Sequence, residues 1–110
     1  MPINDIELEI NEAKKLVEIR DALKSLMDDP RFKLVILEEY FTQEAVRLVH
    51  LKAASPVSTP EGQAAVLRSI DGIGELKQFL STLWMRGDSA EDAIEAGEQE
   101  LASMNEEGEG

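Results

Sequence analysis

The chain has 110 residues and a formal net charge of −12, with 43% hydrophobic and 31% charged residues, which is too apolar for complete disorder. It contains no cysteine, which excludes a disulfide framework and thiol catalysis. The acidic balance leaves no basic patch that could neutralise phosphates, so we expect no direct nucleic-acid partner.

The first expected helix begins at Asn4 or Asp5 and ends near Asp28. Asn4 can cap its N-terminus, and Glu7 supplies the reciprocal side chain of a capping box. Pro30 ends this helix and, with Asp29 as N-cap, starts the next, which predicts antiparallel neighbours. The apolar positions recur at a helical period of about 3.6 residues, and they are Ile6, Ile10, Ala13, Val17, Leu23 and Met27.

The second expected helix, about residues 30–54, is apolar on nearly every side. A helix of this kind is normally buried between neighbours, so we expect it to be the central helix. Glu38 and Glu39 are consecutive and point about 100° apart on a helix. His50 has no carboxylate one helical turn away. We therefore expect no catalytic residue, no metal site and no cofactor.

Residues 55–60, SPVSTP, predict a loop, and Thr59 before Pro60 repeats the helix-start pattern. The third expected helix runs from about Pro60 to Arg86, with Gly87 as the residue that ends it. The two glycines of Asp71–Gly74 indicate a kink or a close helix approach, with a true helix break as the alternative. The apolar stripe consists of Val66, Ile70, Ile73, Leu80, Leu83 and Trp84.

The acidity is concentrated after the third helix. Residues 87–110 contain nine acidic residues and no basic one, which leaves fourteen acids and eleven bases, a net −3, in residues 1–86. Asp88 can start a further short helix, and nothing beyond Met104 can bury apolar surface. We therefore predict a helical bundle domain, residues 1–86, and an acidic C-terminal segment, residues 87–110, that is partly disordered at its end.

These elements predict an all-α fold, in which three long helices form an extended antiparallel bundle or coiled coil, followed by a short acidic C-terminal helix or tail. So thin a bundle exposes apolar surface, which favours a homo-oligomer or a protein partner. The candidate interaction residues lie on the second and third helices and are Phe32, Val35, Ile36, Tyr40, Val46, Val49, Ile73, Leu80 and Trp84.

Three segments, FKLVILEEYFTQEAVRLVHLKA, IDGIGELKQFL and GDSAEDAI, follow one another in the chain. In apolar spacing and order they resemble small helical proteins that tailed bacteriophages encode among their virion assembly and packaging genes. The resemblance covers Leu16 to Glu95 and transfers no functional residue. It implies a phage protein that acts by assembly or by binding a partner, either in the virion or on a host factor.

We therefore expect a non-enzymatic helical interaction protein, a phage assembly or virion accessory factor that packs its helix faces against itself, a phage structural protein or a host protein. The alternative is an acidic inhibitor that binds a host nucleic-acid-processing enzyme through its C-terminal segment. A bundle-fold enzyme is a third class, for which the carboxylates are the sole argument. No membrane span or secretory signal is evident, which places the protein in the host cytoplasm or the virion.

Overall fold

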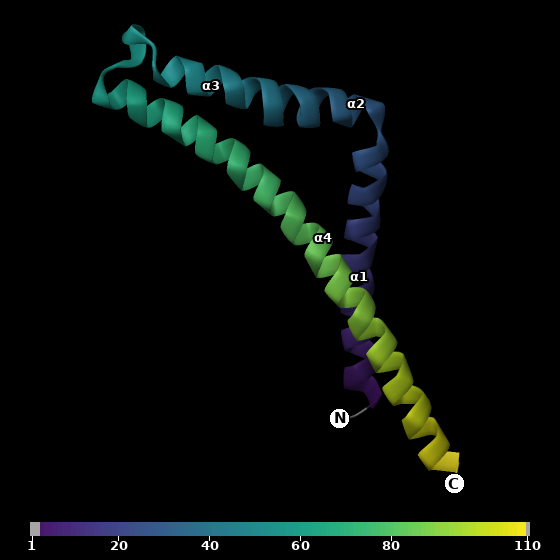
Figure 1. Ribbon diagram of the computed structural model, residues 1–110. Coiled ribbons are helices and arrows are strands. Elements are labelled where there is room, and N and C mark those ends of the chain that lie inside the picture. Colours follow the sequence, from purple (N-terminus) through teal and green to yellow (C-terminus); the bar gives the residue numbers. More distant parts are fainter. Residues whose placement is uncertain (1–2, 110) are drawn as a thin grey trace. The chain divides into compact units, whose positions relative to one another are not determined.

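The computed structural model describes residues 3–109, and helices account for nearly all of them (Figure 1). No strand occurs in this range, which confirms the predicted all-α class. None of the helices described is long and apolar enough to cross a membrane. The elements are α1 (Ile3–Asp28), α2 (Pro30–Phe32), the π-helix η1 (Lys33–Glu44), α3 (Ala45–Lys52), the 3₁₀ turn η2 (Ser55–Val57) and α4 (Pro60–Glu109).

The chain packs as two units. The terminal unit combines the residues up to Lys24 with those from Thr82 onward, and the central unit comprises Ser25–Ser81. Each unit therefore contains part of α1 and part of α4. The residues that pack together in the terminal unit come from the two ends of the chain.

The central unit is built on two predicted helix starts. The Asp29 carboxylate accepts a hydrogen bond from the Arg31 amide at 2.8 Å, with Pro30 as the first helical residue. The Thr59 hydroxyl accepts a hydrogen bond from the Gly62 amide at 3.0 Å and starts α4 at Pro60. Both starts confirm the sequence prediction.

The core of the central unit joins α3 to the first part of α4. Leu48 on α3 is buried together with Val66 and Ile73 on α4. Burying such side chains stabilises the folded state by about 1.5–3 kcal/mol each. The partly buried residues packed around them are Tyr40, Phe41, Ala45, Leu51, Val57 and Ile70.

The second predicted helix is helical from Pro30 to Lys52, but its middle, η1, is a π-helix of twelve residues. Hydrogen bonds in a π-helix reach five residues along the chain, so each turn contains more residues than an α-turn. The Thr42 hydroxyl follows the same spacing and donates to the Leu37 carbonyl at 3.0 Å. A projection at 100° per residue would place Leu34 on the same face as Leu48. Leu48 is buried but Leu34 is exposed, so such a projection misplaces faces here.

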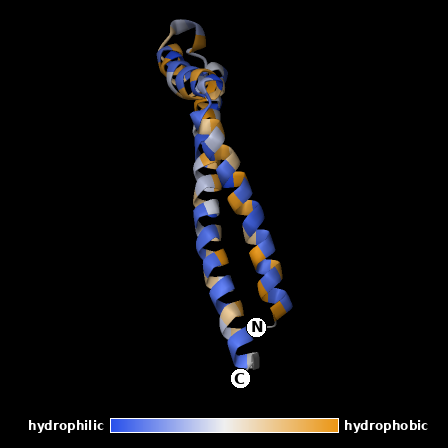
Figure 2. Ribbon diagram, turned by 90° about the vertical axis from the view of Figure 1, so that its right-hand side faces the viewer, coloured by the Kyte–Doolittle hydropathy of each residue, from blue (hydrophilic) through white to orange (hydrophobic). Residues whose placement is uncertain are grey.

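The terminal unit is an antiparallel pair of helices, the first part of α1 and the last part of α4, which Figure 2 shows side by side. A Cβ atom on Gly87 would overlap the Cβ of Arg20, and one on Gly97 would lie 3.0 Å from Cγ1 of Ile10. The two contacts belong to one antiparallel register, because the residue number rises by ten from Gly87 to Gly97 and falls by ten from Arg20 to Ile10. In this register Ile6 lies opposite Leu101, Ala13 opposite Ile94, and Val17 opposite Ala90.

In most of these pairs of opposite residues, which form successive layers between the two helices, a large side chain lies against a small residue. Ile10 lies against Gly97, and the stem of Arg20 lies against Gly87. Ile6, Ile10, Ala13 and Ala90 are all buried. The facing positions are spaced alternately three and four residues apart on both helices, which is the spacing of a heptad repeat.

The prediction that the third helix ends at Arg86 was wrong. Helix α4 continues through Gly87 to Glu109, and no described glycine adopts the positive φ that a terminating glycine uses. The continuation keeps Ala90 and the residues beyond it packed on α1, which offsets the cost of a helical glycine, about 1 kcal/mol. The separate short helix at Asp88 is therefore part of α4.

Helix α4 also runs without interruption through Asp71–Gly74, so the predicted alternative of a helix break there was wrong. A Cβ on Gly72 would lie 4.0 Å from the Tyr40 hydroxyl, and one on Gly74 would meet nothing within 4 Å. The residues beyond Met104, expected to be disordered, are helical as far as Glu109, and Gly110 lies outside the described residues.

Candidate interaction surfaces

The predicted interaction residues fall into three groups. Val35, Val46 and Val49 are exposed, at 57%, 49% and 59% of their full surface. Ile73 is buried in the core of the central unit, so it does not contribute to the surface of that unit. The others are half-buried, and they are Phe32, Ile36, Tyr40, Leu80 and Trp84.

A shallow groove on the central unit follows η1 into α3. Val35 and Ile36 form its apolar part, and Tyr40 continues it toward the core. Its charged part contains Arg47, which forms an ion pair with Glu44. This groove contains three of the predicted interaction residues, Val35, Ile36 and Tyr40.

The polar residues that the sequence analysis considered as possible catalytic or metal-binding groups do not come together in one site. Glu38, Glu39 and His50 are all exposed. Among the side chains that the structure describes, no three His, Asp or Glu are grouped so that they could hold a metal ion. The described residues offer exposed helix faces and two shallow grooves as candidate sites.

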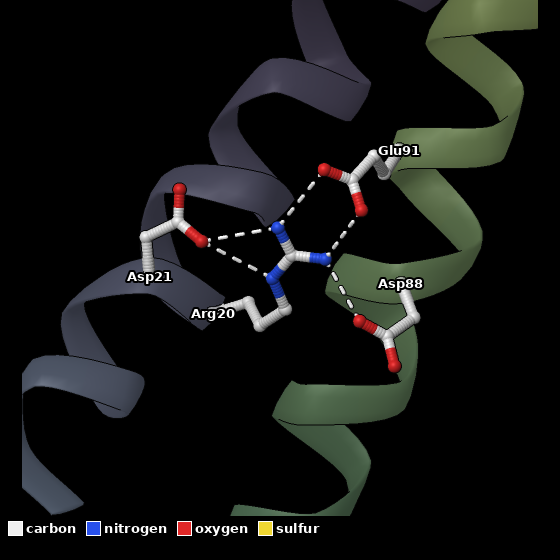
Figure 3. Close-up of polar contacts among 4 residues, drawn as sticks. All are labelled: Arg20, Asp21, Asp88 and Glu91. Atoms are coloured by element: carbon white, nitrogen blue, oxygen red, sulfur yellow. Dashed lines mark hydrogen bonds and ion pairs between the residues drawn. The ribbon is translucent and has the colours of Figure 1, made fainter.

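Arg20 in the terminal unit is a buried charged side chain, with 9% of its surface exposed (Figure 3). Its Nη1 atom donates to Asp88 at 2.8 Å and to Glu91 at 3.0 Å, both on α4. Its Nη2 atom donates to the neighbouring Asp21 at 3.0 Å. Hydrogen bonds to Glu91, then Asp88, then Asp21, raise the pKa of the guanidinium above its ordinary value.

Sequence reasoning did not identify Arg20 as a core residue. It lies seven residues after Ala13 and therefore occupies a heptad position that faces α4. Its aliphatic stem covers Gly87 while its guanidinium reaches the carboxylates at the edge of the helix pair. Asp88 and Glu91, two of the nine acids in residues 87–110, are thus part of the packing of the terminal unit.

A second shallow groove, the terminal groove, runs between α1 and α4 within the terminal unit. Small residues, Ala13, Ala90 and Ala93, form its floor, and the apolar side chains of Leu16 and Met85 border it. Met85 is 67% exposed. The charged residues that line the terminal groove are Glu9, Glu12 and Arg86.

The two units differ strongly in charge. The terminal unit contains fifteen acidic and five basic residues, a net −10, and the central unit contains eight acidic and six basic residues, a net −2. Residues 82–110 contribute −8 of this charge and residues 1–24 contribute −2, so the acidity of the terminal unit lies mainly on the last part of α4.

The comparisons with known proteins supply no relative: no protein-family model, no curated protein and no solved structure matches the chain.

Proposed function

We propose that this protein is a non-enzymatic helical interaction protein that serves as an assembly or virion accessory factor of a tailed bacteriophage. It acts by packing exposed helix faces against a second copy of itself, and against a phage structural protein or a host protein. The phage context comes from the resemblance of its helical segments to small phage assembly proteins.

The exposure of large apolar side chains carries the proposal. Among the residues whose side chains the structure describes, eight hydrophobic ones are buried, whereas twelve large hydrophobic ones expose more than a third of their surface. Contiguous apolar surface on a soluble protein commonly marks an interaction site. Val35, Val46 and Val49 are in this exposed set, and they belong to the nearly neutral central unit.

Charge favours the central unit as the surface for self-association. Two central units bring a net −2 each, whereas two terminal units would each bring a net −10 into contact. Like charges facing each other across an interface cost binding energy. We further propose that the helix pair of the terminal unit is an antiparallel coiled coil, which its heptad spacing and its large-to-small layers support.

Sedimentation velocity of paired double variants tests self-association. We expect Val46→Gln/Val49→Gln to reduce the sedimentation coefficient at high protein concentration to that of a single chain. The matched control, Leu8→Gln/Met85→Gln, removes equally exposed apolar side chains from the terminal unit and should sediment like the wild type. An unchanged coefficient in the first variant, or an equal drop in both, would contradict association through the central unit.

The acidic-inhibitor function remains a second proposal, and one observation favours it. Beyond Glu91, helix α4 carries six described acids, all exposed, which are Asp92, Glu95, Glu98, Glu100, Glu106 and Glu107. A helical row of carboxylates can attract a basic surface on a host nucleic-acid-processing enzyme. Salt-sensitive inhibition of such an enzyme that weakens in Glu95→Gln/Glu98→Gln would support it, and inhibition insensitive to both salt and these substitutions would exclude it.

A further inference from the structure

We infer that the terminal groove is a docking site for a basic amphipathic helix of a partner protein. The occupant has an apolar stripe that enters the groove and Lys or Arg side chains on the flank that faces α1. This inference goes beyond the proposed self-association, and it rests on that proposal only in treating the chain as a binding protein.

The floor of the terminal groove suits a helix. Ala13 on α1 and Ala90 and Ala93 on α4 form this floor, so only small side chains would lie beneath an occupant there. Helix axes pack 8–10 Å apart, and small residues at the contact permit the closest approach. An amphipathic helix laid along this floor would make three helices that share one apolar seam, which is the helix-in-groove mode of recognition.

Leu16 and Met85 provide the anchors. They lie on opposite helices, border the same groove, and are both substantially exposed. Apolar side chains of a docked helix would cover them and remove that surface from water, which favours binding. The exposed state of these two side chains in the free chain is therefore the source of the binding energy.

Charge selects the occupant. Glu9 and Glu12 line the α1 side of the groove, and the unit that surrounds it carries a net −10. A second copy of the terminal unit would bring the same charge and be repelled, whereas a helix flanked by Lys or Arg would be attracted and oriented. Arg86 is the one cation that lines the groove, and it can pair with an acid of the partner.

The test measures the binding of a fluorescent synthetic Leu/Lys amphipathic helix by anisotropy. The protein carries Val46→Gln/Val49→Gln, so that self-association through the central unit cannot affect the result. We expect binding that weakens as salt rises. A Leu/Glu helix of the same pattern, and an oligolysine without an apolar stripe, should not bind.

Two matched substitutions then separate the groove from general attraction to an acidic surface. Met85→Lys and Leu8→Lys each add one positive charge to an exposed apolar site of the terminal unit, but Leu8 does not line the groove. We expect Met85→Lys to weaken binding roughly tenfold, the loss of one interface anchor, and Leu8→Lys to leave it nearly unchanged.

Three results would overturn the inference: no binding of the Leu/Lys helix, equal binding of oligolysine, or equal losses in Met85→Lys and Leu8→Lys. Each of these differs from a failure of the proposed self-association, which is read from the sedimentation of the wild-type chain. Binding of the Leu/Lys helix that only Met85→Lys weakens would establish the groove as the docking site.

Discussion

Replacing Gly87 by alanine should destabilise the protein, although the same change at Gly74, another glycine of helix α4, should stabilise it. Alanine is favoured over glycine in a helix by about 1 kcal/mol. At Gly87 the added methyl group would overlap the Cβ of Arg20 and lie 2.7 Å from its Cγ and Cδ. The Cβ of Arg20 is fixed to its backbone, so rotation of the arginine side chain cannot relieve the overlap, and the helices must separate.

The magnitude follows from a comparison of three glycines on α4. A Cβ on Gly74 would meet nothing within 4 Å, so Gly74→Ala should gain about 1 kcal/mol. Gly87→Ala has the same propensity gain, so the difference between these variants is the overpacking cost, about 1–3 kcal/mol. The stability of Gly97→Ala should fall between the other two, because its Cβ would lie 3.0 Å from Cγ1 of Ile10, a side-chain atom that can shift slightly.

Urea and thermal unfolding, followed by far-ultraviolet circular dichroism, would rank the three variants. The expected order of stability is Gly74→Ala, then Gly97→Ala, then Gly87→Ala. For a chain of this size, 1 kcal/mol corresponds to about 4–8 °C in the unfolding midpoint. If Gly87→Ala raised the midpoint as much as Gly74→Ala does, the close approach of α1 and α4 at Gly87 would be refuted.

Three further predictions concern the central unit. Thr59→Ala should lower the free energy of unfolding by about 0.5–2 kcal/mol in urea titrations, because the Gly62 amide loses its cap, while Thr59→Ser should not. Gln63 donates to two backbone carbonyls at 2.7 and 2.8 Å, so Gln63→Glu, which cannot donate, should cost about 1–3 kcal/mol and Gln63→Met less. Arg31 lowers the pKa of Asp29, so the stability from this carboxylate is present above its ordinary pKa and disappears as the pH falls through the lowered value. Midpoints measured from neutral to acidic pH should therefore fall less steeply in Asp29→Asn, and an identical slope would contradict this.

The parts of the fold that depend on nearby residues could be predicted from the sequence. Asp29 before Pro30 and Thr59 before Pro60 act within one helical turn, and both start helices where expected. The spacing of Ile6, Ile10 and Ala13 requires only a helix with one buried side, and all three are buried. Helix starts and helical apolar spacing depend only on residues within a few turns, so they can be predicted without knowledge of distant residues.

The parts that depend on distant residues could not be predicted. Gly87 looks like a helix end, yet it remains helical because its missing side chain makes room for Arg20, which lies far away in the sequence. Arg20 looks like a surface residue, and its partners Asp88 and Glu91 are 68 and 71 positions away. A heptad count that accepts glycine and arginine marks Gly87 and Arg20 as facing positions, but it does not say which distant residues face them.

The candidate surfaces show the same limit. The exposure of Val46 and Val49 contrasts with the expectation that the second helix is buried between neighbours, and the burial of Ile73 depends on Leu48, which a different segment supplies. The net charges of the two units, −10 and −2, differ little from the −9 and −3 of residues 87–110 and 1–86, so the division of charge could be read from the sequence, whereas the joining of residues from both ends of the chain in one unit could not.

The central claim is that exposed helix faces make this chain an interaction protein that associates with itself. Its most direct test is the molar mass in solution, measured by light scattering over a range of micromolar concentrations. One chain has a mass of 12.2 kDa. We predict a mass that rises with concentration toward a whole multiple of this value, and a mass that stays at 12.2 kDa at high micromolar concentration would contradict the claim.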